Sequence, residues 1–217
     1  MLSFTEENYL KAIYKLSAIE ESVSTNAIAE KLNTKAASVT DMLKRLNEKG
    51  FINYQKYKGV SLTEDGKTIA IKIVRRHRLW ETFLVSKLGF TWDEVHPIAE
   101  ELEHVSSDSL TEKLDAFLGY PKYDPHGDPI PNSKGIFKNN NNIGIKEMKP
   151  KKQYVVHAVT NHDPLYLKHL SKLNLQIGAT VELMDTLAFD ESLMIKTGNG
   201  EVYISKQVAE HILVSEK

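Results

Sequence analysis

The strongest constraint on the fold is a change of pattern along the chain. Up to Gly119, apolar residues recur at helical spacing. The segment 120–150 then contains five of the seven prolines and a tract of four asparagines, which is typical of a linker or an extended loop. Beyond it, short strand-like runs alternate with Gly/Asn turns, and Gly198-Asn199-Gly200 indicates a hairpin. The pattern therefore predicts a mostly α N-terminal half followed by a small all-β domain.

Capping residues and apolar spacing predict the order of elements in the first half. In chain order these are a helix opened by the Ser3-x-x-Glu6 capping box, helices over 25–32 and about 36–48, strands over 51–56 and 60–62, a long helix from Thr63 to about Leu88, a helix opened by the Thr91-x-x-Glu94 capping box and a helix ended by Gly119. Helix, tight turn, helix and β-hairpin is the order of a winged helix-turn-helix. We therefore expect a DNA-binding domain at the start of the chain.

The charge distribution favours DNA binding by a local patch. The net charge of −1 gives no overall attraction to nucleic acid, but residues 35–78 contain 11 Lys/Arg and only 4 Asp/Glu. Small residues at the start of the third helix let its backbone approach the major groove, and polar side chains there reach phosphates or base edges. The candidate DNA contacts on this helix and on the hairpin are Lys35, Ala37, Ser38, Thr40, Lys56 and Lys58. The alternative is a winged helix that contacts other proteins.

A pattern of His and Glu follows in the next helices. Read as one helix at about 100° per residue, four side chains fall within an arc of about 100°: His96, Glu100, Glu103 and His104. His77 and Glu81 share a face of the preceding helix at i, i+4. Residues 91–112 hold seven Asp/Glu and no Lys or Arg, so this run has no local counter-charge. Two such faces could hold a divalent metal, while a solvated face, or one paired with lysines elsewhere, is the alternative.

Missing residue types and motifs exclude several function classes. The chain has no cysteine, which excludes disulfides, thiolate nucleophiles and thiolate metal sites. No apolar run approaches the roughly 18–20 residues of a membrane span, and the first residues lack the basic and apolar regions of a signal peptide, so we expect a cytoplasmic protein. Glu101–His104 forms one Glu-x-x-His, but the second copy that a di-iron helix bundle needs is missing. We therefore expect no enzyme, with a non-haem metalloenzyme as the less favoured alternative.

Several segments together carry a family resemblance. They are Glu7-Asn8-Tyr9-Leu10-Lys11-Ala12-Ile13-Tyr14, the helix-turn-helix, Leu62-Thr63-x-x-Gly66, His77-Arg78-Leu79-x-Glu81, Glu103-His104-x-x-Ser107-Asp108, Asp128-Pro129-Ile130-Pro131 and Ile177-Gly178-Ala179-Thr180-Val181. They resemble the metal-dependent transcriptional repressors of the diphtheria toxin repressor and manganese transport regulator type. The resemblance implies a winged helix-turn-helix over 1–65, a helical metal-binding and dimerisation domain over 66–119, a linker over 120–150 and an SH3-like domain over 151–217.

The resemblance also implies two metal sites. The primary site would be formed by Asn8, Glu100, Glu103 and His104, and the ancillary site by His77, Glu81 and His96, completed by Asp163 from the SH3-like domain. Iron-type members resemble this pattern with methionine and cysteine at the positions of Asn8 and Glu100, and manganese-type members with aspartate and glutamate. Lys11 stands where the short manganese-type proteins have an acidic residue, so we do not expect their two-metal geometry here.

The donor types give an expectation for the metal. A set of nitrogen and oxygen donors without sulfur favours Mn(II) or Fe(II), and we favour Mn(II). By the Irving–Williams order, Zn(II) or Co(II) could bind more tightly in vitro.

The implied partners are a second copy of the chain and DNA. The resemblance implies a homodimer that represses metal-uptake genes from a pseudo-palindromic double-stranded operator. The long helix carries an apolar stripe that could bury a two-fold interface, although packing within one chain could use the same residues: Ile69, Ile73, Trp80, Phe83 and Leu84.

Overall fold

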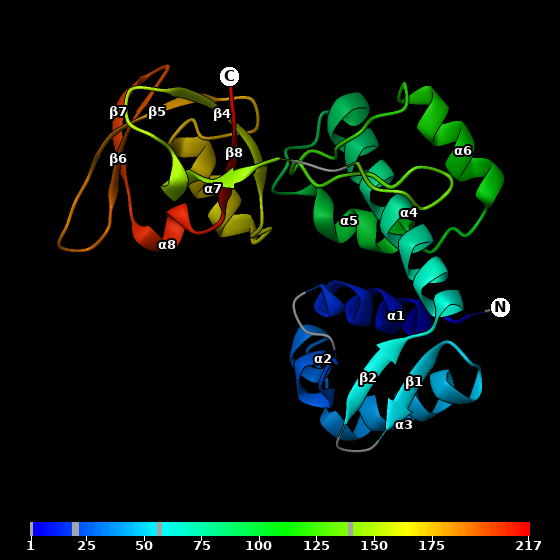
Figure 1. Ribbon diagram of the computed structural model, residues 1–217. Helices are drawn as coiled ribbons and strands as arrows, with labels where there is room; N and C mark the ends of the chain where they lie inside the picture. The colour runs from blue at the N-terminus through cyan, green and yellow to red at the C-terminus, as the bar shows by residue number, and fades with distance from the viewer. Residues whose placement is uncertain (1, 19–21, 56–57, 139–140) are drawn as a thin grey trace. The chain divides into compact units, whose positions relative to one another are not determined.

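The computed structural model describes residues 2–18, 22–55, 58–138 and 141–217. The chain divides into two compact units, each described by itself below (Figure 1). The N-terminal unit comprises Met1–His77, Glu101–Asp108 and Pro131–Ile136. The C-terminal unit comprises Arg78–Glu100, Ser109–Ile130 and Phe137–Lys217.

The N-terminal unit begins with the predicted winged helix-turn-helix. Its elements are α1 (Phe4–Ser17), α2 (Thr25–Lys31), α3 (Ala36–Glu48), β1 (Ile52–Gln55), β2 (Gly59–Leu62) and the first half of α4 (Glu64–Leu88). The capping box of α1 is confirmed, since Ser3 Oγ accepts from the Glu6 amide at 3.3 Å and the Glu6 carboxylate accepts from the Ser3 amide at 3.0 Å. Strands β1 and β2 pair antiparallel with Ile52 opposite Leu62.

An apolar core fixes α1 and α3 in this unit. The largest side chains that it buries completely are Leu10, Ile13, Ile28, Leu43, Leu46 and Ile52. The segment before α2 is tied to the hairpin, because the amide of Val23 donates to the carbonyl of Val60 at 3.0 Å and the reverse bond is 2.9 Å. The burial of one face of α3 leaves its opposite face for solvent.

The helix that carries the acidic run is shorter than expected. Helix α5 spans Val95–Leu102, so Glu103 and His104 lie in a turn after it rather than on the same helical face as His96 and Glu100. Arg76 Nε donates to the backbone carbonyl of Glu103 at 2.6 Å. In a longer helix, this carbonyl would instead accept a hydrogen bond from a backbone amide of the next turn. The Thr91 capping-box contacts are present, but they lie in the turn that precedes α5. Helix α6 (Asp108–Phe117) follows and ends before Gly119, as predicted.

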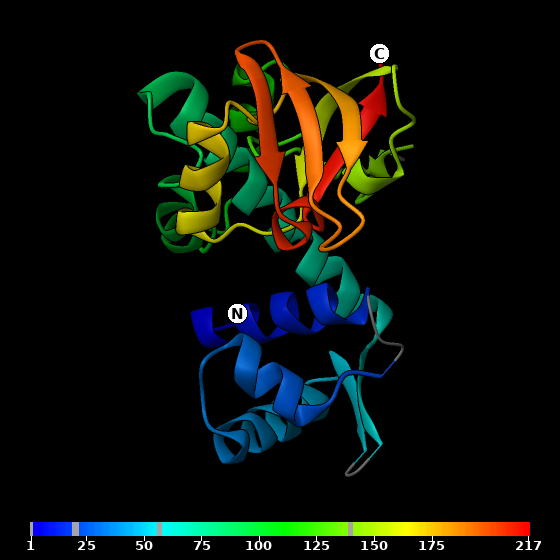
Figure 2. The ribbon, with the colours of Figure 1, turned by 90° about the vertical axis from the view of Figure 1, so that its left-hand side faces the viewer.

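The C-terminal unit contains a six-stranded antiparallel sheet in the order β3-β8-β4-β5-β6-β7. The strands are β3 (Ile143–Gly144), β4 (Gln153–Val159), β5 (Thr180–Thr186), β6 (Leu193–Thr197), β7 (Gly200–Ile204) and β8 (Ile212–Glu216). Figure 2 shows β5, β6 and β7 as neighbouring strands, and the predicted hairpin at Gly198-Asn199-Gly200 is confirmed by the pairing of Thr197 with Gly200. Two helices, α7 (Pro164–Lys172) and α8 (Lys206–Ala209), interrupt the strands and are not anticipated by the sequence pattern.

Residues 120–138 are mostly irregular, as expected for an extended loop, but parts of the segment 120–150 are buried, which the sequence does not predict. His126, Ile130, Ile145 and Met148 are all 6 % exposed or less. The expected linker also supplies β3 and a 3-10 turn, η1 (Ile145–Glu147), whose Ile145 lies in the core under the sheet. The prolines therefore shape a packed connection. None of the helices in the described ranges has the length and apolarity of a membrane span.

Candidate metal centres and nucleic-acid interface

Glu103 is the centre of a buried cluster in the N-terminal unit. Its side chain has no exposed surface, and its two oxygens face different partners. Lys11 Nζ lies 2.6 Å from Oε1, and His77 Nδ1 lies 2.7 Å from Oε2. Burial disfavours the charged carboxylate, but the contacts with His77 and Lys11 outweigh it and lower the pKa of Glu103. Each carboxylate oxygen has two lone pairs, so both contacts still leave Glu103 able to bind a metal.

His104 is oriented by a carboxylate on α1. Its Nδ1 lies 2.7 Å from Glu7 Oε2, so that the Nδ1–H donates to Glu7 and Nε2 keeps a lone pair. Arg76 holds Glu7 in turn, with Nη2 at 3.4 and 3.5 Å from the two carboxylate oxygens. The ring of Phe4 stacks on His104 at a centroid distance of 4.6 Å. A carboxylate behind an imidazole is the usual support for a metal-ligating histidine.

Asn8 provides an observation that points to a ligand. Its side-chain oxygen is buried and makes no hydrogen bond to any residue in the described ranges. A buried amide oxygen without a partner is costly, and a cation removes that cost. With the carboxylate of Glu103 and the imidazole of His104, which the resemblance places in the same site, it would supply nitrogen and oxygen donors of the kinds that bind a divalent metal. We call Asn8, His77, Glu103 and His104 the α1 centre.

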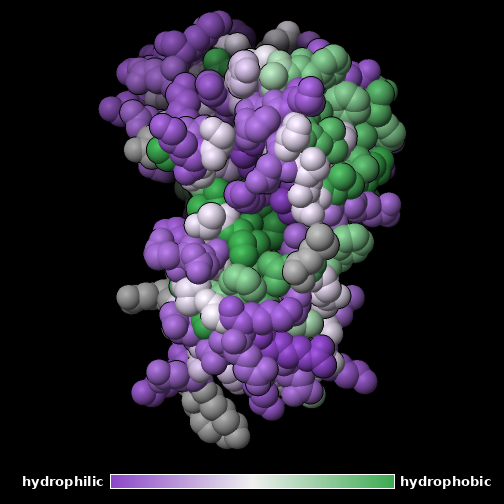
Figure 3. Space-filling view, turned by 90° about the vertical axis from the view of Figure 1, so that its right-hand side faces the viewer, coloured by the Kyte–Doolittle hydropathy of each residue, from purple (hydrophilic) through white to green (hydrophobic). Residues whose placement is uncertain are grey.

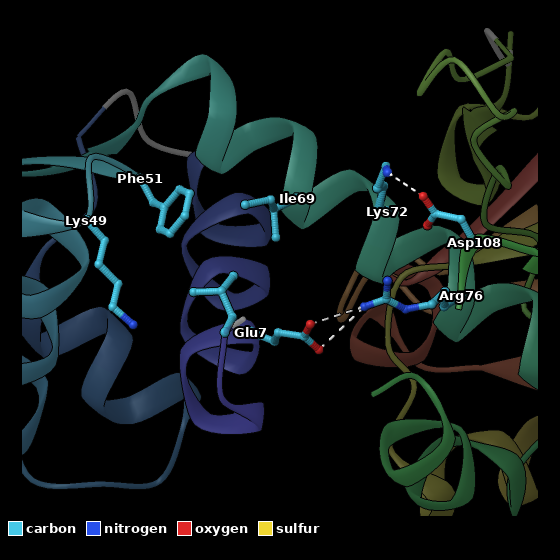
Figure 4. A pocket seen from close by; sticks show the side chains of 8 residues that line it. Glu7, Lys49, Phe51, Ile69, Lys72, Arg76 and Asp108 are labelled. Carbon is cyan, nitrogen blue, oxygen red and sulfur yellow. Dashed lines mark hydrogen bonds and ion pairs between the residues drawn. The ribbon is translucent and has the colours of Figure 1, made fainter. Parts of the chain in front are cut away.

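A pocket of about 530 Å³ opens beside the α1 centre (Figure 4). Figure 4 shows Glu7 and Arg76 pointing toward each other, and Lys72 pairing with Asp108 at 2.9 Å. Leu2, Phe51 and Ile69 form the apolar part of its lining. Because Glu7 and Arg76 line this pocket, solvent reaches the pair that orients His104.

The C-terminal unit holds a second cluster, around Glu81. This carboxylate is 1 % exposed and lies between two imidazoles, with Oε1 at 3.1 Å from His96 Nδ1 and Oε2 at 3.6 Å from His126 Nδ1. His126 is completely buried, and its Nε2–H donates to the carbonyl of Trp92 at 2.7 Å. Glu100 joins from α5, with Oε1 at 3.7 Å from His96 Nε2. We call Glu81, Asp124 and His126 the α4 centre, since their ligand atoms all lie within 4.8 Å of one another.

Ion pairing inside the α4 centre also satisfies these groups. Burial and the neighbouring Glu81 and Asp128 raise the pKa of Asp124 to about 7. Burial opposes the charged form of His126, but Glu81 and Asp124 outweigh it and raise its pKa to about 9. Arg78 further compensates the carboxylates, at 3.6 Å from Asp124 and 2.8 Å from Asp128. A metal in the α4 centre would therefore have to displace a proton from His126.

Contacts within each unit involve several of the expected ligands. His77 contacts Glu103 in the N-terminal unit, and His96 contacts Glu100 and Glu81 in the C-terminal unit. Asp163 caps α7, where its Oδ1 accepts from the amides of Leu165 and Tyr166 at 2.8 and 3.2 Å. The preceding residue, His162, stacks on His126 at a centroid distance of 4.5 Å.

Of the α4 centre, the sequence predicts Glu81 as a ligand but not Asp124 or His126. Asp124 is not singled out by any spacing, and His126 has no ligand-spaced partner nearby in the sequence. Its burial comes from packing with α4 and the segment at Trp92, which is remote in sequence. The sequence feature that could have indicated these two residues is the Asp-Pro-His-Gly run, which places a carboxylate and an imidazole next to turn residues.

The acidic run of residues 91–112 also finds partners from elsewhere in the chain. Besides the Lys11–Glu103 pair, Lys72 contacts Asp108 and Lys168 Nζ lies 3.6 Å from Asp93. Such pairs are expected if the acidic run is neutralised by lysines elsewhere in the chain and binds no metal. They do not involve the buried oxygen of Asn8.

The expected DNA-contacting residues lie on an exposed surface. Lys35 is the N-cap of α3, and it is exposed together with Ala37 and Ser38. Thr40 is half-buried and donates to the carbonyl of Ala36 at 3.0 Å. Lys58 is exposed beside β2, while Lys56 lies outside the described residues. On the face drawn in Figure 3, the part of the surface that α3 and the hairpin form is mostly hydrophilic.

Comparison with protein families assigns all three regions of the chain. Residues 1–60 match the model described as "Iron dependent repressor, N-terminal DNA binding domain", and residues 63–132 match "Iron dependent repressor, metal binding and dimerisation domain". Residues 144–216 match the FeoA domain.

Individual relatives agree with these matches. The iron-dependent repressor IdeR of Mycobacterium tuberculosis is 37 % identical over 129 residues, which are 58 % of this chain and 55 % of that protein, so the match spans about half the length of this curated relative. The diphtheria toxin repressor of Corynebacterium diphtheriae is 26 % identical over 98 % of this chain and 97 % of its own length. A solved structure titled "Manganese-dependent transcriptional repressor complex with manganese" is 31 % identical, with a TM-score of 0.87 over 98 % of this chain and 100 % of that chain.

Proposed function

Because this chain belongs to the family of metal-dependent transcriptional repressors that includes the diphtheria toxin repressor and the iron-dependent repressors, we propose that it binds operator DNA when a divalent metal fills the α1 centre. The family consists of transcriptional regulators rather than enzymes, and it has DNA-binding, metal-binding and dimerisation domains. The genes that we expect it to control are those of metal uptake.

The observation that carries the proposal is the unpartnered side-chain oxygen of Asn8 on α1. When bound, the metal would supply a positive charge that joins this oxygen to Glu103 and His104. Asn8 belongs to the helix that packs on the helix-turn-helix core, whereas Glu103 and His104 belong to the turn after α5. Filling the α1 centre would therefore fix α1, and with it α3, relative to that turn. Such coupling between two sites is typically worth about 1–3 kcal/mol.

The proposed metal is Mn(II), with Fe(II) as the alternative. Amide, carboxylate and imidazole donors without sulfur favour these ions over softer ones. The solved structure that is 31 % identical to this chain is titled as a complex with manganese, which supports the choice. Zn(II) or Co(II) could still bind more tightly in vitro by the Irving–Williams order. A second ion in the α4 centre is part of the proposal, because its two carboxylates and one imidazole are also oxygen and nitrogen donors without sulfur.

The proposed DNA-binding form is a homodimer on a pseudo-palindromic operator. Two residues of the expected apolar stripe, Ile73 and Leu84, are already buried within the chain. Trp80 and Phe83 are half-buried, and Phe117, at a centroid distance of 6.2 Å from Phe83, is 63 % exposed. This aromatic group on α4 and α6 is the surface that we propose for the two-fold contact. A dimer would then place two α3 helices in successive major grooves.

Selection of DNA from a random pool tests the proposed function. The pool is incubated with the full chain in parallel with Mn(II) and with a chelator. A palindromic motif enriched with Mn(II) and not with the chelator is the expected result. Enrichment of the same motif in both arms would contradict metal gating and would support a metal-independent winged-helix regulator, the alternative that the Lys11, Lys72 and Lys168 pairs favour.

Glu7→Gln should weaken metal binding although Glu7 is not assigned as a ligand. The carboxylate fixes the Nδ1–H tautomer of His104, and loss of such support typically lowers metal affinity by roughly 10- to 100-fold. Mn(II) affinity is measured by competition with a chromogenic chelator. Glu6→Gln is the matched control, because Glu6 pairs with Lys49 at 2.6 Å. Equal Mn(II) affinity of the Glu7 variant and the control would rule out the positioning role.

Ser38→Glu should separate DNA binding from metal binding. A carboxylate on the exposed start of α3 would face DNA phosphates, and we expect operator affinity to fall by roughly 10-fold or more. Mn(II) affinity without DNA should be unchanged, because Ser38 lies outside the α1 centre. Ser109→Glu, on an exposed position of α6, makes the same chemical change as a control. If the two variants bind operator equally well, α3 is not the recognition helix.

A further inference from the structure

A buried ammonium lies inside the proposed metal centre. Lys11 is 5 % exposed, and its Nζ lies 2.6 Å from Glu103 Oε1, a contact between two side chains that are 7 % and 0 % exposed. Lys11 follows Asn8 by three residues on α1, so both side chains lie on the same face of that helix. The cation is thus fixed by local helix geometry next to the ligands.

The charges of the centre are balanced when no metal is bound. Glu103 is the carboxylate that faces Lys11, and Asn8 is neutral. The negative charge of Glu7 is compensated by Arg76. A buried ion pair is strongly destabilised when one partner is removed, since the other charge stays buried without compensation. Lys11 therefore stabilises the metal-free form of Glu103.

We propose that Lys11 is an internal competitor of the metal, which neutralises Glu103 in the metal-free protein and thereby raises the metal concentration at which the α1 centre fills. The inference rests on the proposed function, because it assumes that Glu103 is a metal ligand. A divalent ion on Glu103 would lie within a few ångströms of the ammonium, and like charges at that distance repel. Lys11 must either move away or remain at a cost, and both reduce metal affinity.

Removal of the Lys11 ammonium should favour metal binding through its effects on both the metal-bound and the metal-free form. In the metal-bound form it abolishes the repulsion between Lys11 and the ion. In the metal-free form it leaves the carboxylate of Glu103 buried with less compensation, which raises the free energy of that form. Metal binding should therefore become tighter, and the metal-free protein less stable.

The test measures Mn(II) affinity of the full chain without DNA, by competition with a chromogenic chelator. Lys11→Met removes the charge from an unbranched side chain, and Lys11→Gln removes the charge but keeps a hydrogen-bond donor for Glu103. A single charge within roughly 4–6 Å shifts the pKa of a neighbouring group by about 1–3, which is a factor of about 10 or more in affinity for a proton. By analogy, we expect both variants to bind Mn(II) at least about 10-fold more tightly than the wild type. Their melting temperatures in chelator should be lower and should recover with Mn(II).

Controls separate this inference from the proposed function. Lys11→Arg keeps the charge and should stay close to the wild type, and Lys31→Met removes a charge from an exposed position on α2. If the wild type binds Mn(II) and both neutral variants bind it equally or more weakly, Lys11 is not a competitor. If no form binds Mn(II), the proposed function itself fails. If a neutral variant is unfolded in chelator, Mn(II) should refold it, and failure to do so would overturn the inference.

Discussion

The double variant Glu103→Ala/His104→Ala should lose the metal dependence of operator binding. It removes two of the donors of the α1 centre, so metal affinity should fall by more than the roughly 10- to 100-fold expected for a supporting residue. Operator affinity in Mn(II) should then equal that in chelator, and the 5- to 150-fold difference typical of a coupled pair of sites should disappear. Fluorescence anisotropy of a labelled operator, titrated in both conditions, measures the loss.

Two controls show whether such a loss is specific. Glu101→Ala, on an exposed position of α5, removes a carboxylate outside the centre and should keep full metal dependence. Circular dichroism should show that the double variant is folded, because removal of Glu103 leaves Lys11 buried without its partner. A folded double variant that binds operator with the affinity and metal dependence of the wild type would disprove the site assignment.

Gly127→Ala should be the most destabilising small substitution in the C-terminal unit. Gly127 has φ +86, and a Cβ there would lie 2.0 Å from the carbonyl oxygen of His157 and 2.5 Å from Ala158 Cα. The backbone cannot move away easily, because the amide of Val159 donates to the carbonyl of His126 at 2.9 Å. We expect the free energy of unfolding, measured with urea, to fall by about 3–5 kcal/mol.

Gly178→Ala is the matched control for backbone strain alone. Gly178 has φ +89 in the same unit, but a Cβ there meets nothing within 4 Å. An L-residue in the left-handed region costs roughly 1–2 kcal/mol, which is the loss expected for this control. Equal losses for the two variants would mean that β4 and the Asp124–Asp128 turn do not approach as closely as described. Such a result would also question the position of His126 in the α4 centre.

Local chemistry explains what the sequence predicts well. Ser3 with Glu6 and Ser24 with the amide of Ala27 act within one helical turn, so the starts of α1 and α2 follow from adjacent residues. The hairpin at Gly198-Asn199-Gly200 is set by its own turn residues in the same way. The helix-turn-helix and four strands of the C-terminal sheet, β4 to β7, could therefore be predicted from spacing and caps, whereas β3 and β8 are not.

Contacts between distant residues explain what the sequence does not predict. The end of α5 at Leu102 depends on Arg76, which bonds the carbonyl of Glu103 from 27 residues away. The pairing of Lys11 with Glu103 spans 92 residues, and an acidic run read by itself shows no such counter-charge. Residue types and helical spacing thus select Glu81 and the members of the α1 centre, while Asp124 and His126 are found only from the tertiary structure.

The linkage between metal and operator tests the central claim most directly. The affinity of the full chain for Mn(II) is measured by chelator competition, first alone and then with a saturating amount of the selected operator duplex. Because coupling between two ligands is reciprocal, the operator should tighten Mn(II) binding by the same factor by which Mn(II) tightens operator binding. An Mn(II) affinity that the operator leaves unchanged would contradict metal gating of DNA binding.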